Sequence, residues 1–229
     1  MSDYKNIAAK VSERYFNYPD LLGIIWVGSS SFGITDKLSD IDIRLIVNNS
    51  DKQSPMQQFE YEGIKIEVDE MSWQWLTENM DPDSDQRWIR EKGVILYDPT
   101  KKLVETFSAL EARLRECTKQ AIWKSYKSLF SQYEVEKCIT RRDFVTADLY
   151  VHKTIENLLK FIFLYRGEPV PPFKWRWYFA KKMKLLPASL IRQINSSQLP
   201  IPPAIEKYAK QLMLKQGYSE AMVNSPWLY

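Results

Sequence analysis

The sequence VGSSSFG at residues 27–33, followed by SDIDIR at residues 39–44, decides how the fold of this chain is interpreted. The second segment continues into an alternating apolar pattern, which predicts a β-strand. Residues two apart on a strand point to the same side, so Asp40 and Asp42 would present two carboxylates together. Such adjacent like charges are unfavourable unless a cation neutralises them, and Mg²⁺ prefers carboxylate oxygens, waters and phosphates as ligands.

The residues just upstream are suited to contact phosphate. Leu21–Val27 is an almost continuous apolar run that predicts a buried central strand, and Gly28 and Ser29 follow it directly. Glycine permits close backbone approach, and a serine at such a turn offers backbone N–H and hydroxyl donors to phosphate oxygens. A phosphate cradle beside metal-binding carboxylates is the arrangement that phosphoryl transfer needs.

A third carboxylate is expected from the strand predicted at Ile64–Asp69. Glu67 and Asp69 share the face opposite the apolar residues of this strand, and Glu67 is the first choice, as a metal ligand or as a base. Asp69 remains the alternative. Arg44 shares the face of the aspartates, where it would either contact phosphate or form a structural ion pair with them.

The two parts of the chain have different periodicities. Strands are predicted at Leu21–Val27, Ile41–Val47, Ile64–Asp69 and Gly93–Tyr97, whereas the pattern from Leu103 to about Lys137 is helical. A long helix is predicted over 143–165, with Asp143 as its cap and Gly167 after its end, and shorter helices near Phe173, after Pro187 and over 203–215. The sequence therefore predicts an α/β (α+β) domain with a mixed sheet over residues 1–100, followed by an all-α helical bundle domain over residues 101–229.

Composition narrows the class of protein. The chain has 229 residues, 45% of them hydrophobic and 27% charged, which is typical of a folded protein rather than a disordered one. The net charge of only +3 does not favour a nucleic-acid or membrane partner. The polar start of the chain does not resemble a secretory signal, and the run Leu21–Val27 is too short to span a bilayer. A cytoplasmic location is expected.

The spacing of these residues resembles the polymerase-β-like nucleotidyltransferase superfamily. Its pattern is Gly-Ser, about ten residues, Asp-x-Asp and a later acidic residue, which stands here as Gly28-Ser29, Asp40-Ile41-Asp42 and Glu67. Within the superfamily the chain looks closest to antibiotic nucleotidyltransferases of the aminoglycoside and lincosamide type and to their uncharacterised relatives. Two further elements are similar to theirs, at residues 94–99 and 171–175.

The resemblance implies an enzyme that uses Mg²⁺ to transfer a nucleoside monophosphate, with ATP as the default donor, to a hydroxyl of a small-molecule acceptor. Asp40, Asp42 and Glu67 would bind the metal, and Gly28 and Ser29 would hold the β- and γ-phosphates. In the second similar element, Lys174 would reach the triphosphate across a cleft between the two domains.

Other functions remain open at this stage. A protein acceptor, as in nucleotidyltransferase antitoxins that modify a toxin partner, is the second possibility, and an RNA acceptor is the third. The alternative from another class of protein is a non-catalytic nucleotide-binding module, which keeps the fold but has lost turnover. The presence of all three acids argues against it, because a site without activity has no need to keep them. The oligomeric state is also open, with a homodimer as one possibility.

Overall fold

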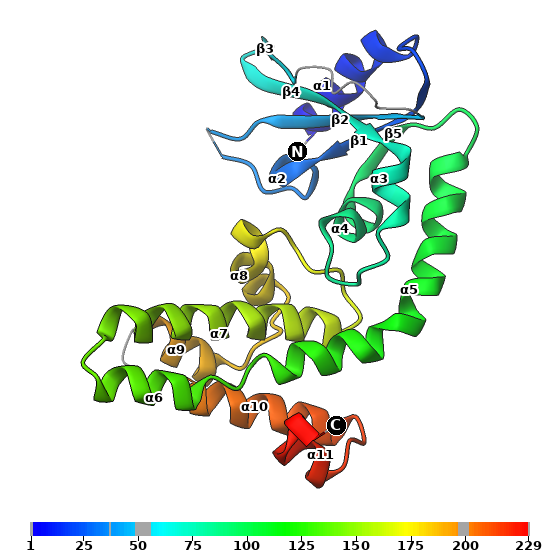
Figure 1. The fold of residues 1–229 in the computed structure, drawn as a ribbon. Helices are drawn as coiled ribbons and strands as arrows, with labels where there is room; N and C mark the ends of the chain where they lie inside the picture. The colour runs from blue at the N-terminus through cyan, green and yellow to red at the C-terminus, as the bar shows by residue number, and fades with distance from the viewer. Residues whose placement is uncertain (1, 37, 49–55, 197–201, 229) are drawn as a thin grey trace. The chain divides into compact units, whose positions relative to one another are not determined.

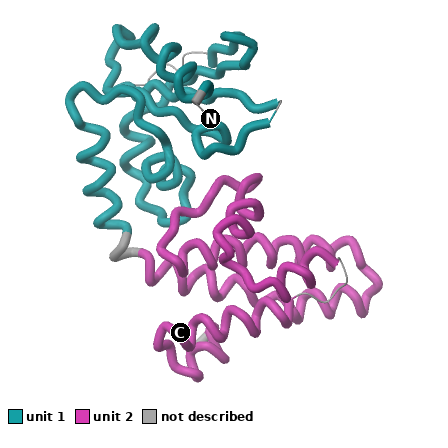
Figure 2. Tube along the Cα trace, turned by 180° about the vertical axis from the view of Figure 1, so that it is seen from behind, with its two compact units in different colours: residues 1–114 teal, residues 115–229 magenta. Residues whose placement is uncertain are grey.

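A computed structural model describes residues 2–36, 38–48, 56–196 and 202–228 (Figure 1). The chain divides into two compact units, residues 1–114 and residues 115–229, and the division falls inside a long helix (Figure 2). The predicted boundary near residue 100 coincides with the start of that helix. The elements of the first unit are α1 (Ser2–Ser12), η1 (Glu13–Tyr15), β1 (Leu21–Val27), α2 (Gly28–Ser31), β2 (Ile41–Val47), β3 (Gln57–Tyr61), β4 (Ile64–Ser72), α3 (Trp73–Glu78), α4 (Asp85–Lys92), β5 (Val94–Tyr97) and the beginning of α5 (Lys102–Lys127).

The strands form one mixed sheet in the order β3-β4-β2-β1-β5. Strands β2 and β4 are parallel, whereas the other neighbouring pairs are antiparallel. The mixed sheet is confirmed, and all four predicted strands are present. The fifth strand, β3, was not predicted because it is a polar edge strand, with three exposed residues at Gln57, Gln58 and Glu60.

Each face of the sheet has its own core. On one face, Ile24, Ile43 and Ile66 pack with buried residues of α1. On the other face, Ile25 and Ile46 pack with residues of α3 and α5. Figure 1 shows α1 on one side of the sheet and α3 on the other. Helix α1 was not predicted, because its buried side chains are few and its remaining residues are polar.

The second unit contains only helices among its described residues: the end of α5, then α6 (Gln132–Thr140), α7 (Phe144–Tyr165), α8 (Phe173–Lys182), α9 (Ala188–Asn195), α10 (Pro202–Lys215), α11 (Glu220–Asn224) and η2 (Pro226–Leu228). The Asp143 side chain caps α7 by accepting a hydrogen bond from the Thr146 N–H, and Gly167 follows its end with a positive φ of 73°, as predicted. The helical pattern from Leu103 to Lys137 is divided between α5 and α6. None of the helices in the described part of the chain could span a membrane.

Candidate functional site

Three carboxylates converge on one face of the sheet. Asp40 immediately precedes β2, Asp42 lies within it, and Glu67 lies in β4 directly beside Asp42 in the parallel register. One carboxylate oxygen from each residue lies within 4.8 Å of the others, and all three side chains are partly exposed. We call these residues the carboxylate cluster. Asp69 is not part of the cluster, since it lies two residues further along β4, beside Arg44.

The alternation of buried and partly exposed residues along β2 determines which face of the sheet carries the cluster. Ile41, Ile43 and Leu45 are buried in the core that faces α1, so Asp42 and Arg44 point to the opposite side. Residues of α3 and α5 contribute to the core around Ile46 on that opposite side, further along the strand. The cluster therefore sits at the end of β2 where the sheet face remains partly open to solvent.

The turn after β1 touches the cluster directly. Gly28 has a positive φ of 79°, and a Cβ added there would lie 1.9 Å from Oδ2 of Asp42. Only glycine fits this position, because any side chain would displace the carboxylate as well as strain the backbone. The close approach brings the backbone of the β1–α2 turn next to the predicted metal ligands.

The three serines of α2 differ in what their hydroxyls do. The Ser30 hydroxyl accepts a hydrogen bond from Trp26 Nε1 at 3.1 Å, and the Ser31 hydroxyl donates to the Gly28 carbonyl at 2.9 Å. Both therefore serve local structure. The Ser29 hydroxyl takes part in no hydrogen bond among the described residues, and its side chain is half-buried. Of the three, Ser29 is the residue best placed to receive a ligand.

Positive and polar groups surround the cluster on its own sheet. Lys65 Nζ lies 2.5 Å from Oε1 of Glu67, and Gln58 Nε2 donates to the same oxygen at 3.0 Å. The hydrogen bond to Glu67, together with the charges of Glu67, Asp40 and Asp42, raises the pKa of the Lys65 ammonium above its usual value. An Arg44 guanidinium nitrogen lies 3.9 Å from Oδ1 of Asp42.

Sequence reasoning missed Lys65 and Gln58. Lys65 was detectable, because it precedes Glu67 by two residues and must share its face. Gln58 was not, because the strand that carries it was not predicted. Lys65 and Arg44 bring two positive charges next to the three acids. The oxygen-only ligand set is compatible with a divalent cation.

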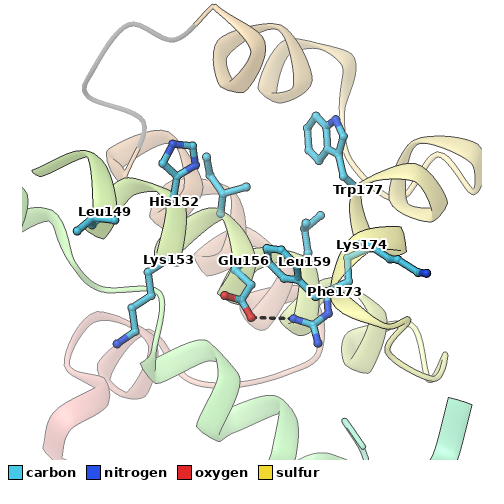
Figure 3. A pocket seen from close by; sticks show the side chains of 10 residues that line it. Leu149, His152, Lys153, Glu156, Leu159, Phe173, Lys174 and Trp177 are labelled. Atoms are coloured by element: carbon cyan, nitrogen blue, oxygen red, sulfur yellow. Dashed lines mark hydrogen bonds and ion pairs between the residues drawn. The ribbon is translucent and has the colours of Figure 1, made fainter. Parts of the chain in front are cut away.

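Lys174 belongs to the other compact unit. Its exposed side chain lies over the ring of Trp175, with Nζ 5.8 Å from the ring centroid, and it extends away from His152 and Glu156 in Figure 3. The contact of Lys174 with a triphosphate stays a prediction. His152, the only histidine, is exposed on α7, and Nε2 lies 3.3 Å from Oδ2 of Asp148 one turn earlier. This setting is that of an ordinary exposed helix residue.

Comparison with solved structures shows which known fold this chain resembles. The chain is similar to a nucleotidyltransferase-like protein from Exiguobacterium sibiricum 255-15, with a TM-score of 0.51, over 96% of this chain and 76% of that chain. The two sequences are 14% identical, so the likeness concerns the fold alone. The chain thus has a nucleotidyltransferase-like fold, and this fold carries a cluster of three carboxylates that is compatible with a metal ion.

Two comparisons of sequence add little about function. A family model described as a domain of unknown function, DUF4037, matches residues 86–176. That segment begins after Glu67 and therefore contains neither the carboxylate cluster nor the turn at Gly28. No curated protein matches the chain. The particular resemblance to aminoglycoside and lincosamide enzymes has no support from these comparisons.

Proposed function

We propose that this protein is a Mg²⁺-dependent nucleotidyltransferase that transfers AMP from ATP to a hydroxyl of a small-molecule acceptor, such as an aminoglycoside- or lincosamide-like compound. The carboxylate cluster carries the proposal, because Asp42 and Glu67 on neighbouring strands and Asp40 just before β2 converge within 4.8 Å on a nucleotidyltransferase-like fold. Like charges at this separation are unfavourable unless a cation joins them. The choice of donor and acceptor rests on the resemblance of the sequence motifs.

Each residue of the site has a task in the proposed reaction. Asp40, Asp42 and Glu67 would bind Mg²⁺, which when bound neutralises charge on the phosphates. The turn at Gly28 and Ser29 would hold the β- and γ-phosphates through backbone N–H groups and the Ser29 hydroxyl.

Charged side chains around the cluster would assist. Glu67 would orient either the metal or the attacking hydroxyl, and Lys65 and Gln58 hold its carboxylate in place. Arg44 would keep Asp42 in position or contact a phosphate, and Lys174 would contact the triphosphate.

The proposed transfer forms one bond and breaks one bond at the α-phosphorus. The acceptor oxygen attacks the α-phosphorus in line, so that a new oxygen–phosphorus bond forms while the bond between the α-phosphorus and the bridging oxygen breaks. Pyrophosphate leaves with the electron pair of the broken bond. The proton of the acceptor hydroxyl passes to Glu67 or to solvent.

A transfer assay tests the proposal. Wild-type protein is incubated with ATP, Mg²⁺ and a panel of aminoglycosides and lincosamides, and mass spectrometry detects an acceptor heavier by one AMP group. We expect the adduct with wild type and a loss of at least about 100-fold in Asp42→Asn, because a metal ligand is weakened. An undiminished rate in Asp42→Asn would contradict the mechanism.

A matched pair of variants identifies the third carboxylate. Glu67→Gln should reduce transfer about as strongly as Asp42→Asn, whereas Asp69→Asn should leave most of the activity. Both residues lie on the same face of β4, but only Glu67 belongs to the cluster. The reverse result would assign the role to Asp69. Growth of a host strain on the same antibiotics, with and without the gene, shows whether the acceptor is of this class.

A further inference from the structure

Helix α8 has an unusual composition. Between Phe173 and Lys184 the sequence reads FKWRWYFAKKMK, which contains five basic residues, five aromatic residues and no acidic residue. The formal charge of this segment is therefore +5, although the whole chain has a net charge of only +3. A low net charge thus hides a strong local concentration of positive charge.

The aromatic and basic residues occupy the solvent-facing half of α8. Phe173 and Tyr178 are 72% and 38% exposed, and Trp177 is half-buried. At 100° per residue, these rings lie on the same arc of the helix as three exposed lysines. Those lysines are Lys174, Lys181 and Lys182. Lysines and rings are interspersed across the arc instead of separating fully into a charged side and an apolar side, and we call this arc the aromatic–basic face. Its order around the helix is Phe173, Trp177, Lys181, Lys174, Tyr178 and Lys182.

Direct contacts order the face. Lys181 Nζ lies 5.6 Å from the centroid of the Trp177 ring, and Lys182 Nζ lies 5.7 Å from that of Tyr178. Each lysine is four residues after its ring, so the pairs share one side of the helix. Cation–π contacts of this kind hold the ammonium groups close to flat apolar surfaces.

The opposite half of α8 anchors the helix. Phe179 and Ala180 are buried, and Arg176 is 8% exposed. The Arg176 guanidinium donates to the Pro171 carbonyl at 2.9 Å and forms an ion pair with Glu156 of α7 at 2.8 Å, drawn as a dashed line in Figure 3. This pairing neutralises Glu156, which is the acidic residue among the pocket-lining side chains of α7 and α8.

A pocket adjoins the face. Its volume is about 660 Å³, and its lining includes Phe173 and Trp177 from α8 with Leu149 and Leu159 from α7 (Figure 3). This volume is typical of small-molecule sites, and the lining combines apolar and aromatic side chains with five charged or titratable residues out of ten. Two rings of the aromatic–basic face, Phe173 and Trp177, therefore also form one wall of the pocket, against which a base could stack.

We propose that the aromatic–basic face of α8 binds single-stranded nucleic acid. Bases would stack on Phe173, Trp177 and Tyr178, and lysines would contact the phosphates, which is how sequence-tolerant single-strand binding surfaces work. Lys174 and Lys182 are eight residues apart, or roughly 12 Å along the helix axis, so the face can contact more than one phosphate. A helix that binds a membrane surface would instead separate its apolar and basic residues onto opposite sides.

This inference does not depend on nucleotide transfer. It concerns a second ligand, held by residues of α7 and α8 in the second compact unit, of which only Lys174 also has a role in the transfer proposal. Binding should therefore persist in EDTA and in the Asp42→Asn variant. Failure of nucleic-acid binding would leave the transfer proposal unchanged, and the absence of transfer would leave this one unchanged.

Fluorescence anisotropy with a labelled 12-nucleotide oligo(A) RNA, in EDTA and at several salt concentrations, provides the test. We expect the double variant Phe173→Ala, Tyr178→Ala to bind about tenfold more weakly, because stacking platforms are lost. The double variant Lys181→Ala, Lys182→Ala should reduce the slope of log affinity against log salt by about 1.4, since about 0.7 is lost for each single-strand phosphate contact. All four positions are exposed, so the variants should fold.

A second cation–π pair in the same unit supplies the control. Tyr133 is 71% exposed on α6, and Lys137 Nζ lies 5.7 Å from its ring centroid. The double variant Tyr133→Ala, Lys137→Ala should bind RNA like wild type.

Three results would each overturn the inference. The first is RNA binding that does not change in the aromatic variant. The second is AMP alone binding as tightly as the 12-mer. The third is that vesicles of phosphatidylcholine and phosphatidylglycerol bind with the same dependence on Phe173 and Tyr178.

Discussion

Two groups of charged side chains in the first compact unit differ in how their charges are balanced. The carboxylate cluster has three acids on a partly open sheet face, with Lys65 and Arg44 beside them. A second group, which we call the buried ion cluster, joins α4 to α5 and consists of Arg87, Arg90, Glu91 and Glu111. It contains two arginines and two glutamates, and the arginines are only 3% and 5% exposed.

The difference separates structural charge from functional charge. In the buried ion cluster the arginines also donate to backbone carbonyls, as when Arg90 Nη1 donates to the Leu76 carbonyl at 2.7 Å. The arginines and glutamates of this group pair with one another inside the protein, although three buried atoms, Arg90 Nε, Arg90 Nη2 and Glu111 Oε1, have no hydrogen-bond partner among the described residues. The carboxylate cluster remains partly exposed instead, so a cation from solution can reach it. Removing a charge from the buried ion cluster should therefore reduce stability, whereas removing one from the carboxylate cluster should reduce activity.

The largest effect on stability is expected from Arg90→Ala. The change leaves the Leu76 carbonyl without its donor and removes a cation 3.7 Å from Glu111, so we expect a loss of about 3 kcal/mol in the free energy of unfolding. Denaturant titration measures it. Arg113→Ala, at an exposed position of α5, should change the unfolding free energy by less than about 0.5 kcal/mol. Equal effects of the two variants would show that the buried ion cluster contributes no special stability.

Gly28→Ala should mainly affect activity. The new Cβ would meet Oδ2 of Asp42, so we expect transfer to fall about 100-fold as the carboxylate is displaced. Gly63→Ala is the matched control, because Gly63 has a similar φ of 76° but no atom within 4 Å of an added Cβ. Both variants carry the same kind of backbone strain. Similar activity in the two variants would mean that the contact with Asp42 is unimportant.

The smallest effect is a pH dependence of stability. Burial, with the neighbouring Glu91, raises the pKa of Glu111 to about 7 against the opposing charges of Arg87 and Arg90. Because the folded state holds this proton more tightly than the unfolded chain, Glu111 contributes stability that is complete below about pH 4.5 and is lost as pH rises through 7.

Glu111→Gln should remove this contribution. Solvent reaches part of the group, so the unfolding free energy of wild type should fall by about 1 kcal/mol more than that of the variant between pH 5 and pH 8. Thermal or denaturant unfolding at a series of pH values measures the difference. Parallel curves for the two proteins would contradict the raised pKa.

The difference between the carboxylate cluster and the buried ion cluster also explains which parts of the structure the sequence could predict. The strands that carry Asp42 and Glu67 were predicted because their apolar residues alternate with period two, and the same alternation placed both acids on one face. Their direct pairing was not predictable, because strand register depends on contacts between distant segments of the chain.

Helix α4 was missed for a physical reason. Its buried positions include Gln86, Arg87 and Arg90, where an amphipathic helix usually has apolar residues. Because these side chains are compensated by Glu91, Glu111 and backbone carbonyls, they tolerate burial without leaving a hydrophobic period in the sequence. Pattern analysis therefore could not detect the buried ion cluster, whereas it found the carboxylate cluster because Asp42 and Glu67 occupy the polar positions of a clear apolar alternation.

In the proposed function, the carboxylate cluster binds a divalent cation together with a nucleotide. The most direct test is the thermal midpoint of wild type and Asp42→Asn with a non-hydrolysable ATP analogue, with and without Mg²⁺. Ligand at 100 times its dissociation constant adds about 2.7 kcal/mol, or about 5–10 °C for a chain of this size. We predict a Mg²⁺-dependent rise in wild type that Asp42→Asn loses; no rise in wild type, or an equal rise in both proteins, would contradict the claim.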